Sequence, residues 1–197
     1  ICKSDDRVCV DLSKLSGLND LQKNYKLLLI GQAIKNSCNS GDFFVDYFGC
    51  KKTDIKNFFL GWSLADYSFE KYKSKKKRKN DSKIFHNFEK EVKSVCKSYF
   101  YTRDLINTPA NILGPYEILQ SAKKFLKKFT FVDLVSGPKL EKSFPLIAAV
   151  GQGADKGKQP ILGEFRFKKK MSKKKVFLIG EGVSFDTRQE ERREGKE

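Results

Sequence analysis

The sequence predicts an α/β fold, and three features of the chain lead to this prediction. Apolar side chains recur at steps of three and four across residues 82–106, which is the period of an amphipathic helix. A second helical pattern covers residues 115–129 and opens with a proline. Four short apolar runs follow, several without alternation, as in strands of a sheet that is covered on both faces. Helices followed by such runs favour an α/β domain.

The length and charge of the chain limit the classes of protein to consider. Its 197 residues allow one large domain or two small ones, and 40 Lys and Arg against 24 Asp and Glu give a net charge of +16. This charge is compatible with nucleic-acid binding, because Lys and Arg displace counterions from phosphates. We favour a compositional bias toward lysine, since lysine greatly outnumbers arginine and base recognition depends on arginine.

The cysteines and the hydropathy pattern predict a cytoplasmic protein. The five cysteines are odd in number and include no CxxC pair, so neither a disulfide framework nor a zinc ribbon is indicated. Reduced, structural thiols fit a cytosolic location. No run approaches the ~18 apolar residues of a membrane span, and no signal peptide is recognisable. The first residue is Ile1 rather than Met, which favours a natural N-terminus further upstream.

The first half of the chain predicts strands and one clear helix. The run RVCVDL and the aromatic run after the turn residues Asn39–Gly41 are strand candidates. The run YKLLLIGQAI fits either a buried strand or a helix, because periodicity does not separate the two. A helix begins at Thr53 or Asp54, either of which can cap it. It ends before residues 73–80, where six of eight side chains are basic and predict an exposed loop.

Residues 82–106 predict a long helix with one apolar stripe. The stripe consists of Phe85, Phe88, Val92, Val95 and Tyr99. The helix ends before NTPAN, because Pro109 disfavours helical backbone at Thr108. His86, the only histidine, lies beside the stripe and is interpreted as a boundary or surface residue. Because the chain has no other histidine, a serine or cysteine catalytic triad elsewhere in it would have no histidine base.

The second half predicts one helix and four strands. Gly114 caps a helix whose first residue is Pro115, and Glu117 makes its first turn negative. The predicted buried face is Ile118, Leu119, Ala122, Phe125, Leu126 and Phe129. The strand candidates are residues 130–135, 144–151, 161–167 and 176–180. Residues 168–175 contain six lysines and are predicted to form a hairpin loop.

Three stretches of the chain, RDLINTPANILGPYEI, FPLIAAVGQGA and VFLIGEGVSFDT, resemble the leucyl (cytosol) aminopeptidase family of two-metal exopeptidases. The stretch GWSLADYSFEKYKSKKK is similar to the helix and basic loop that close the family's N-terminal domain. The order and approximate spacing agree, and the resemblance covers residues 55–187. It implies the end of a small N-terminal α/β domain over residues 1–81, a linker helix over 82–106 and the first strands and helix of an α/β metallo-aminopeptidase catalytic domain over 107–187.

The resemblance also implies an activity and its requirements. Family members remove N-terminal residues, often leucine, from peptides, assemble as hexamers and use two divalent ions, which are Zn²⁺, Mn²⁺ or Mg²⁺. Peptide hydrolysis at neutral pH requires an activated water and a polarised carbonyl, and paired divalent ions supply both. Several carboxylates are needed to hold such a pair, because they offset its charge.

The sequence predicts metal ligands in residues 176–187, where a strand candidate leads into a turn. By the resemblance, Asp186 matches the family's metal-bridging aspartate, and we expect it to be a ligand. Glu181 falls where the family has a lysine that contacts a metal site; its carboxylate can ligate a cation but reverses a charge there. No catalytic residue is assigned. Gly180 and Gly182 are expected to let the backbone approach the site closely.

The end of the chain departs from the family pattern. After Thr187 the family continues with two glycines and further metal-binding carboxylates, whereas residues 188–197 hold four basic and four acidic side chains and nothing apolar. We expect a disordered tail and an inactive, truncated or frame-shifted fragment of an aminopeptidase. Two alternatives stay open: a basic nucleic-acid-binding protein, and a non-catalytic remnant that only oligomerises. Asn107, Pro109 and Asn111 are interpreted as structural.

Overall fold

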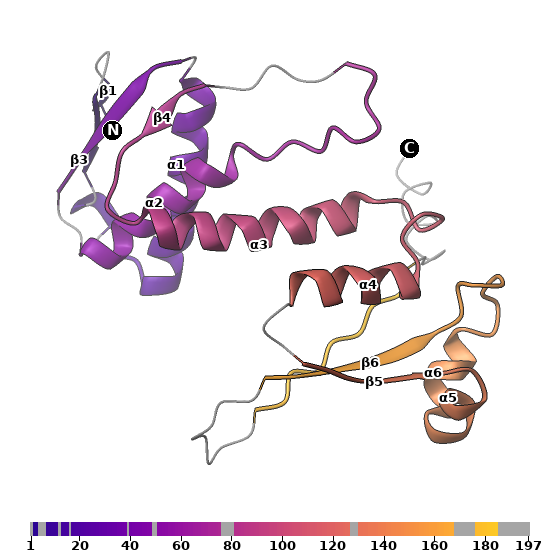
Figure 1. Cartoon of the computed structure of the whole chain (residues 1–197). Helices are drawn as coiled ribbons and strands as arrows, with labels where there is room; N and C mark the ends of the chain where they lie inside the picture. The colour runs from indigo at the N-terminus through magenta and orange to yellow at the C-terminus, as the bar shows by residue number, and fades with distance from the viewer. Residues whose placement is uncertain are drawn as a thin grey trace, which may run out of the picture. The chain divides into compact units, whose positions relative to one another are not determined.

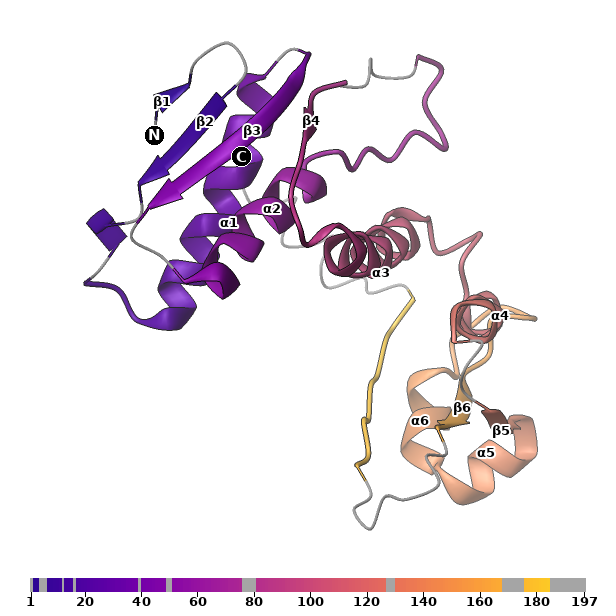
Figure 2. The ribbon, with the colours of Figure 1, turned by 60° about the vertical axis from the view of Figure 1, so that its left-hand side comes forward.

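The structure is a computed structural model that describes residues 2–3, 7–11, 13–15, 17–38, 40–48, 51–75, 81–126, 130–167 and 176–184. The chain divides into two compact units, Ile1–Asn107 and Thr108–Glu197, drawn in Figures 1 and 2. Each unit is described by itself. Both combine helices with strands, so the predicted α/β class is confirmed. Among the described residues, no helix combines the length and the apolar character needed to cross a membrane.

The first unit is built on a sheet of four strands in the order β1-β2-β3-β4. The strands are β1 (Cys2–Lys3), β2 (Arg7–Asp11), β3 (Asp42–Phe48) and β4 (Lys83–Ile84). β1 is antiparallel to β2, and the other neighbours are parallel. Along β2, Val8 and Val10 are fully buried and Arg7 is exposed, which is the alternation of a half-covered strand. The strands predicted at RVCVDL and at the aromatic run are therefore confirmed.

Two helices, α1 (Asp20–Ser37) and α2 (Lys52–Leu64), cover one face of this sheet (Figure 2). The ambiguous run YKLLLIGQAI lies inside α1, so its helical alternative is the correct one. The determining signal lies before the run, because Asn19 caps α1 by accepting a hydrogen bond from the Gln22 backbone N–H at 2.9 Å. The Asn19 backbone N–H in turn donates a hydrogen bond to Gln22 Oε1 at 3.4 Å.

α1 and α2 pack backbone against backbone through two glycines. A Cβ atom at Gly31 would overlap the carbonyl oxygen of Phe58, and a Cβ atom at Gly61 would overlap that of Leu28. Any side chain at these positions would therefore push the helices apart, so the crossing depends on glycine.

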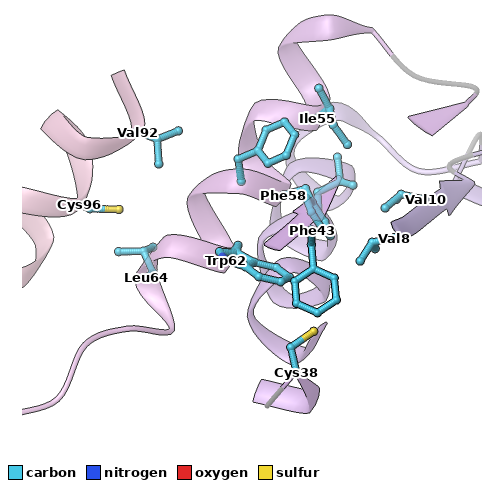
Figure 3. Close-up of a cluster of buried hydrophobic side chains, with 12 residues drawn as sticks. Val8, Val10, Cys38, Phe43, Ile55, Phe58, Trp62, Leu64, Val92 and Cys96 are labelled. Atoms are coloured by element: carbon cyan, nitrogen blue, oxygen red, sulfur yellow. The ribbon is translucent and has the colours of Figure 1, made fainter. Parts of the chain in front are cut away.

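The core of the first unit lies between the sheet and the helices (Figure 3). Its buried members are Val8, Val10, Leu27, Cys38, Phe43, Ile55, Phe58, Phe59, Trp62, Leu64, Val92 and Cys96. The ring of Trp62, the only tryptophan, lies 5.8 Å from the ring of Phe43, centroid to centroid. Aromatic side chains thus supply much of the apolar surface that this core buries.

The helix predicted over residues 82–106 begins later than expected. α3 spans Glu89–Asn107, and β4 precedes it. The Phe85 N–H donates to the Phe43 carbonyl oxygen at 3.2 Å, so this part of the chain pairs with β3. The prediction was wrong at this end because β3 offers backbone hydrogen bonds that the side-chain period does not reveal.

The second unit contains three helices and two strands among its described residues. They are α4 (Pro115–Phe125), β5 (Thr130–Ser136), α5 (Gly137–Ser143), α6 (Pro145–Val150) and β6 (Ile161–Arg166). α4 begins as predicted, with Gly114 at the cap and the Glu117 carboxylate accepting the Gly114 N–H at 2.8 Å. β5 and β6 pair antiparallel, which confirms the strand candidates at these two places.

The buried face predicted for α4 is only partly present. Leu119 is buried, and a Cβ at Gly163 of β6 would lie 2.7 Å from its Cδ1 atom, so this side chain packs on the sheet. Ile118 and Phe125 are exposed. Phe129 lies outside the described residues. The face of α4 that contacts the sheet is therefore narrower than the apolar stripe in the sequence.

Two of the predicted strands were wrong. The run at 144–151 contains α6, in which the Ala148 N–H donates to the Phe144 carbonyl oxygen at 3.2 Å. Pro145 at the first helical position favours this outcome, because its fixed φ suits a helix start. Residues 176–180 form no strand, and among the described residues the sheet of this unit consists of β5 and β6.

The expected sheet covered on both faces was also wrong for this unit. Within β5 and β6 only Val135 is buried. The lysine-rich residues 168–175, predicted as a hairpin loop, lie outside the described residues, as do residues 76–80 of the basic run at 73–80.

His86 lies between β4 and α3, half-buried against Phe59, which confirms its predicted boundary position. The two rings are stacked with centroids 4.3 Å apart, and His86 Nδ1 accepts the Phe88 N–H at 3.1 Å. Burial lowers the pKa of His86 below its ordinary value; the Glu89 carboxylate opposes this shift, and the Lys93 ammonium adds to it. The packed ring is therefore neutral near pH 7.

We predict that Gly61→Ala destabilises the first unit by about 2–3 kcal/mol, because the new methyl group must separate α1 from α2. Urea unfolding followed by Trp62 fluorescence measures the change, since this tryptophan is buried in the affected core. The matched control is Gly17→Ala, where a Cβ atom meets nothing within 4 Å. Equal unfolding free energies for the two variants would contradict the backbone contact.

We also predict that acid destabilises the first unit through His86. Because the folded-state pKa lies below the ordinary value of about 6.5, the unfolded state binds the proton more readily, and the free energy of unfolding falls as pH drops through that value. His86→Gln should remove this part of the pH dependence. The check is the difference between wild type and variant in urea unfolding at about pH 8 and about pH 5; a difference that does not change with pH would count against it.

Candidate functional site

The predicted metal ligands are not brought together in the described part of the chain. Asp186, with the residues that follow it, lies outside the described residues, so its role stays a prediction. Glu181 is described and exposed, in a non-regular segment at 176–184. A Cβ atom at Gly180 or Gly182 would meet none of the described atoms within 4 Å, and the expected close approach of this backbone to a metal site stays a prediction.

The described residues also hold no ready-made set of metal ligands elsewhere. Across them, no three His, Cys, Asp or Glu side chains lie close enough together to bind an ion. They do not by themselves fit a two-ion centre, which needs several carboxylates. No step of a hydrolytic reaction is assigned to them.

Three polar residues of the RDLINTPAN stretch lie around Tyr67. The Tyr67 hydroxyl donates to Asp104 Oδ1 at 3.0 Å and accepts from Asn107 Nδ2 at 2.9 Å. The Arg103 guanidinium lies 4.7 Å from the centre of the Tyr67 ring, and the Phe100 ring lies 5.3 Å away. These contacts involve a residue, Tyr67, that the sequence reasoning did not single out.

The surroundings of Tyr67 change its acidity. Burial raises the pKa of its hydroxyl above the ordinary value, and the Asp104 carboxylate raises it further. The hydrogen bond from Asn107 and the charge of Arg103 act in the opposite direction. The hydroxyl therefore stays protonated at neutral pH and acts as a hydrogen-bond donor to Asp104.

Beyond α3 the chain turns as the NTPAN motif predicts. α3 ends at Asn107, and the N–H groups of Ile112 and Leu113 donate to the Pro109 carbonyl oxygen at 3.0 and 2.9 Å. The structural interpretation of Pro109 is consistent with this turn. Asn111 lies in the same turn and is exposed.

A salt bridge joins the loop between α6 and β6 to the first turn of α4. Lys158 Nζ lies 3.1 Å from Glu117 Oε2, the same oxygen that accepts the Gly114 N–H. The Lys158 hydrogen bond and the Gly114 N–H lower the pKa of Glu117 below its ordinary value. A Cβ at Gly114 would lie 2.5 Å from the Lys158 side chain, so glycine makes room for this ion pair. This loop contains the GQGADKG sequence.

The two buried cysteines, Cys38 and Cys96, are interpreted as structural. Cys9 is half-buried. Burial raises the pKa of Cys96 to about 11, with the Asp66 carboxylate adding to the effect. A thiol with this pKa is protonated at neutral pH and is a poor nucleophile or metal ligand.

Comparison with known proteins points to one family. Residues 100–188 match the model of the cytosol aminopeptidase family, catalytic domain. A probable cytosol aminopeptidase of Phytoplasma mali is 32% identical over 195 residues, which covers 90% of this chain and 39% of that protein. A probable cytosol aminopeptidase of Brucella melitensis is 31% identical over 143 residues, 65% of this chain and 29% of that protein. The chain thus spans less than half the length of the relatives that it matches.

Solved structures agree in fold. The cytosol aminopeptidase of Coxiella burnetii superimposes with a TM-score of 0.61 and 25% identity, over 76% of this chain and 32% of that one. A mutant of tomato leucine aminopeptidase gives 0.59 at 17% identity, over 82% and 36% of the two chains. A bottromycin maturation enzyme solved in complex with Mn gives 0.55 at 13% identity, over 80% and 44%. In sequence and in fold, this chain is similar to the cytosol aminopeptidases.

Proposed function

We propose that this chain is part of a metal-dependent aminopeptidase that removes N-terminal residues, leucine among them, from peptides. The observation that carries the proposal is the match of residues 100–188 to the family's catalytic domain, together with the fold shared with the Coxiella burnetii enzyme. We further propose a cytoplasmic location and assembly with other copies of the chain, as in the hexamers of the family.

Two divalent ions, which are Mn²⁺, Zn²⁺ or Mg²⁺, would supply an activated water and a polarised carbonyl in such an enzyme. In this chain, Asp186 is the residue that we propose to hold them, with Glu181 as a second carboxylate at the position of the family's lysine. Two carboxylates do not offset the roughly four positive charges of an ion pair. We therefore propose that the 197-residue chain binds ions weakly and does not hydrolyse peptides alone.

We predict that the purified chain binds Mn²⁺ only in the millimolar range, and that Asp186→Asn weakens this binding further because it removes a charged ligand. Isothermal titration with Mn²⁺ measures the affinity, and a leucine-chromogenic substrate measures turnover. Asp155→Asn is the matched control, since Asp155 is an exposed acid of the same unit. Robust turnover, or tight binding of two ions, would overturn the proposed inactivity; equal binding by both variants would remove Asp186 as a ligand.

A second candidate function, binding of single-stranded nucleic acid, is favoured by the segment at 69–75. The rings of Phe69 and Tyr72 meet edge to face at 5.6 Å, and Lys71 Nζ lies 5.3 Å from the centre of the Tyr72 ring. Lys73 and Lys75 are exposed beside them. Aromatic rings with neighbouring lysines can stack on bases and contact phosphates, and the net charge of +16 acts in the same direction.

For this second function we predict that a labelled single-stranded oligonucleotide binds at low salt and is released as salt rises, because phosphate contacts release counterions. Fluorescence anisotropy measures the affinity. Changing Lys71 and Lys75 together to alanine should weaken binding more than Lys97→Ala, which removes an exposed lysine of α3. Absence of binding at low salt would exclude this function, and an equal loss in both variants would exclude the segment.

A further inference from the structure

The turn that follows α2 is held in place by a buried lysine. Lys35 of α1 is 3% exposed, and its ammonium group lies 3.0 Å from Asp66 Oδ1 in this turn. The same ammonium donates to the carbonyl oxygen of Ser82 and lies 5.4 Å from the centre of the Trp62 ring. A buried charge is strongly destabilising unless its partners stay in position. The turn at 65–67 is therefore held rigidly against α1.

Tyr67 follows Asp66 directly in this turn, and its side chain contacts the end of α3. Its hydroxyl takes part in two hydrogen bonds of opposite sense, as donor to Asp104 and as acceptor from Asn107. Arg103 lies over its ring. One side chain thus uses its donor, its acceptor and its aromatic face on a single turn of helix, which specifies the position of that turn more closely than one contact would.

The last turn of α3 requires stabilising contacts from outside the helix. The last carbonyl groups of a helix have no partner within the helix, so terminal turns fray. No basic residue lies in the last turn of α3, and Pro109 prevents the helix from continuing. Asn107 is also the last residue of the first compact unit, and Thr108 begins the second.

We propose that Tyr67 anchors the carboxyl end of α3, and that Arg103, Asp104 and Asn107 are positioning residues that fix the place where the chain passes from the first unit to the second. Three polar residues of the RDLINTPAN stretch then hold the last turn of the first unit's α3 in place. This role goes beyond the proposed peptidase function and requires neither metal nor substrate.

The test is native-state amide hydrogen exchange of the full chain, resolved by mass spectrometry. Tyr67→Phe keeps the ring and removes the hydroxyl, and exchange at residues 103–107 should rise about 5- to 10-fold, which is the value of losing one or two hydrogen bonds. Exchange in α1 and α2 should stay unchanged. Tyr99→Phe is the matched control, because this ring is half exposed on the same helix; it should leave exchange at 103–107 at the wild-type rate.

Two further variants separate the anchor from general destabilisation. Asp104→Asn keeps an oxygen that accepts the Tyr67 hydroxyl and should retain most of the protection, whereas Asp104→Ala should lose it. Trp62 fluorescence gives the global unfolding midpoint for each variant. Unchanged exchange at 103–107 in Tyr67→Phe would overturn the proposal. It would also be overturned by equal increases in exchange throughout the first unit, or by equal effects of the Asn and Ala variants.

Discussion

The first unit depends on the contact between two helix backbones. Because Gly31 and Gly61 have no side chains, α1 and α2 approach until the carbonyl groups of one lie against the Cα atoms of the other. This approach places Trp62 of α2 against the sheet and brings Lys35 of α1 to Asp66 beyond the end of α2. The same crossing thus sets both the apolar core and the ion pair of the buried Lys35 with the half-exposed Asp66. A longer separation would expose the core and leave a buried ammonium without its carboxylate.

The elements that could be predicted from the sequence are those with a local signal. β2 shows alternating side chains, β3 is an aromatic run that follows turn residues, and α4 shows Gly114 and Pro115 at its start. The runs at 144–151 and 176–180 were wrongly predicted as strands, because an unbroken apolar run fits a helix or a strand equally well. The start of α3 was misplaced for a related reason: β3, forty residues away, provides hydrogen bonds to the backbone there.

The residues of the candidate site also differ in whether a local sequence signal predicts them. A motif in one stretch of chain can be read directly, which is how Asp186 and Glu181 were predicted, although the structure describes only the second of them. Tyr67 could not be found by that route, because its partners lie about forty residues further along and nothing in the residues around it marks them. The RDLINTPAN stretch was identified from sequence, but the contacts of its polar side chains became visible only in three dimensions.

The exposed segment at 176–179 has a consequence for handling the molecule. Its four apolar side chains are 80–97% exposed, and such a stretch can add to the sheet edge of a second copy, the usual first step of aggregation. The six lysines of residues 168–175 come immediately before it in the sequence, and their positive charge opposes the approach of a second copy. Colloidal stability should therefore be greatest in dilute buffer, and salting the solution should bring copies together by screening that repulsion.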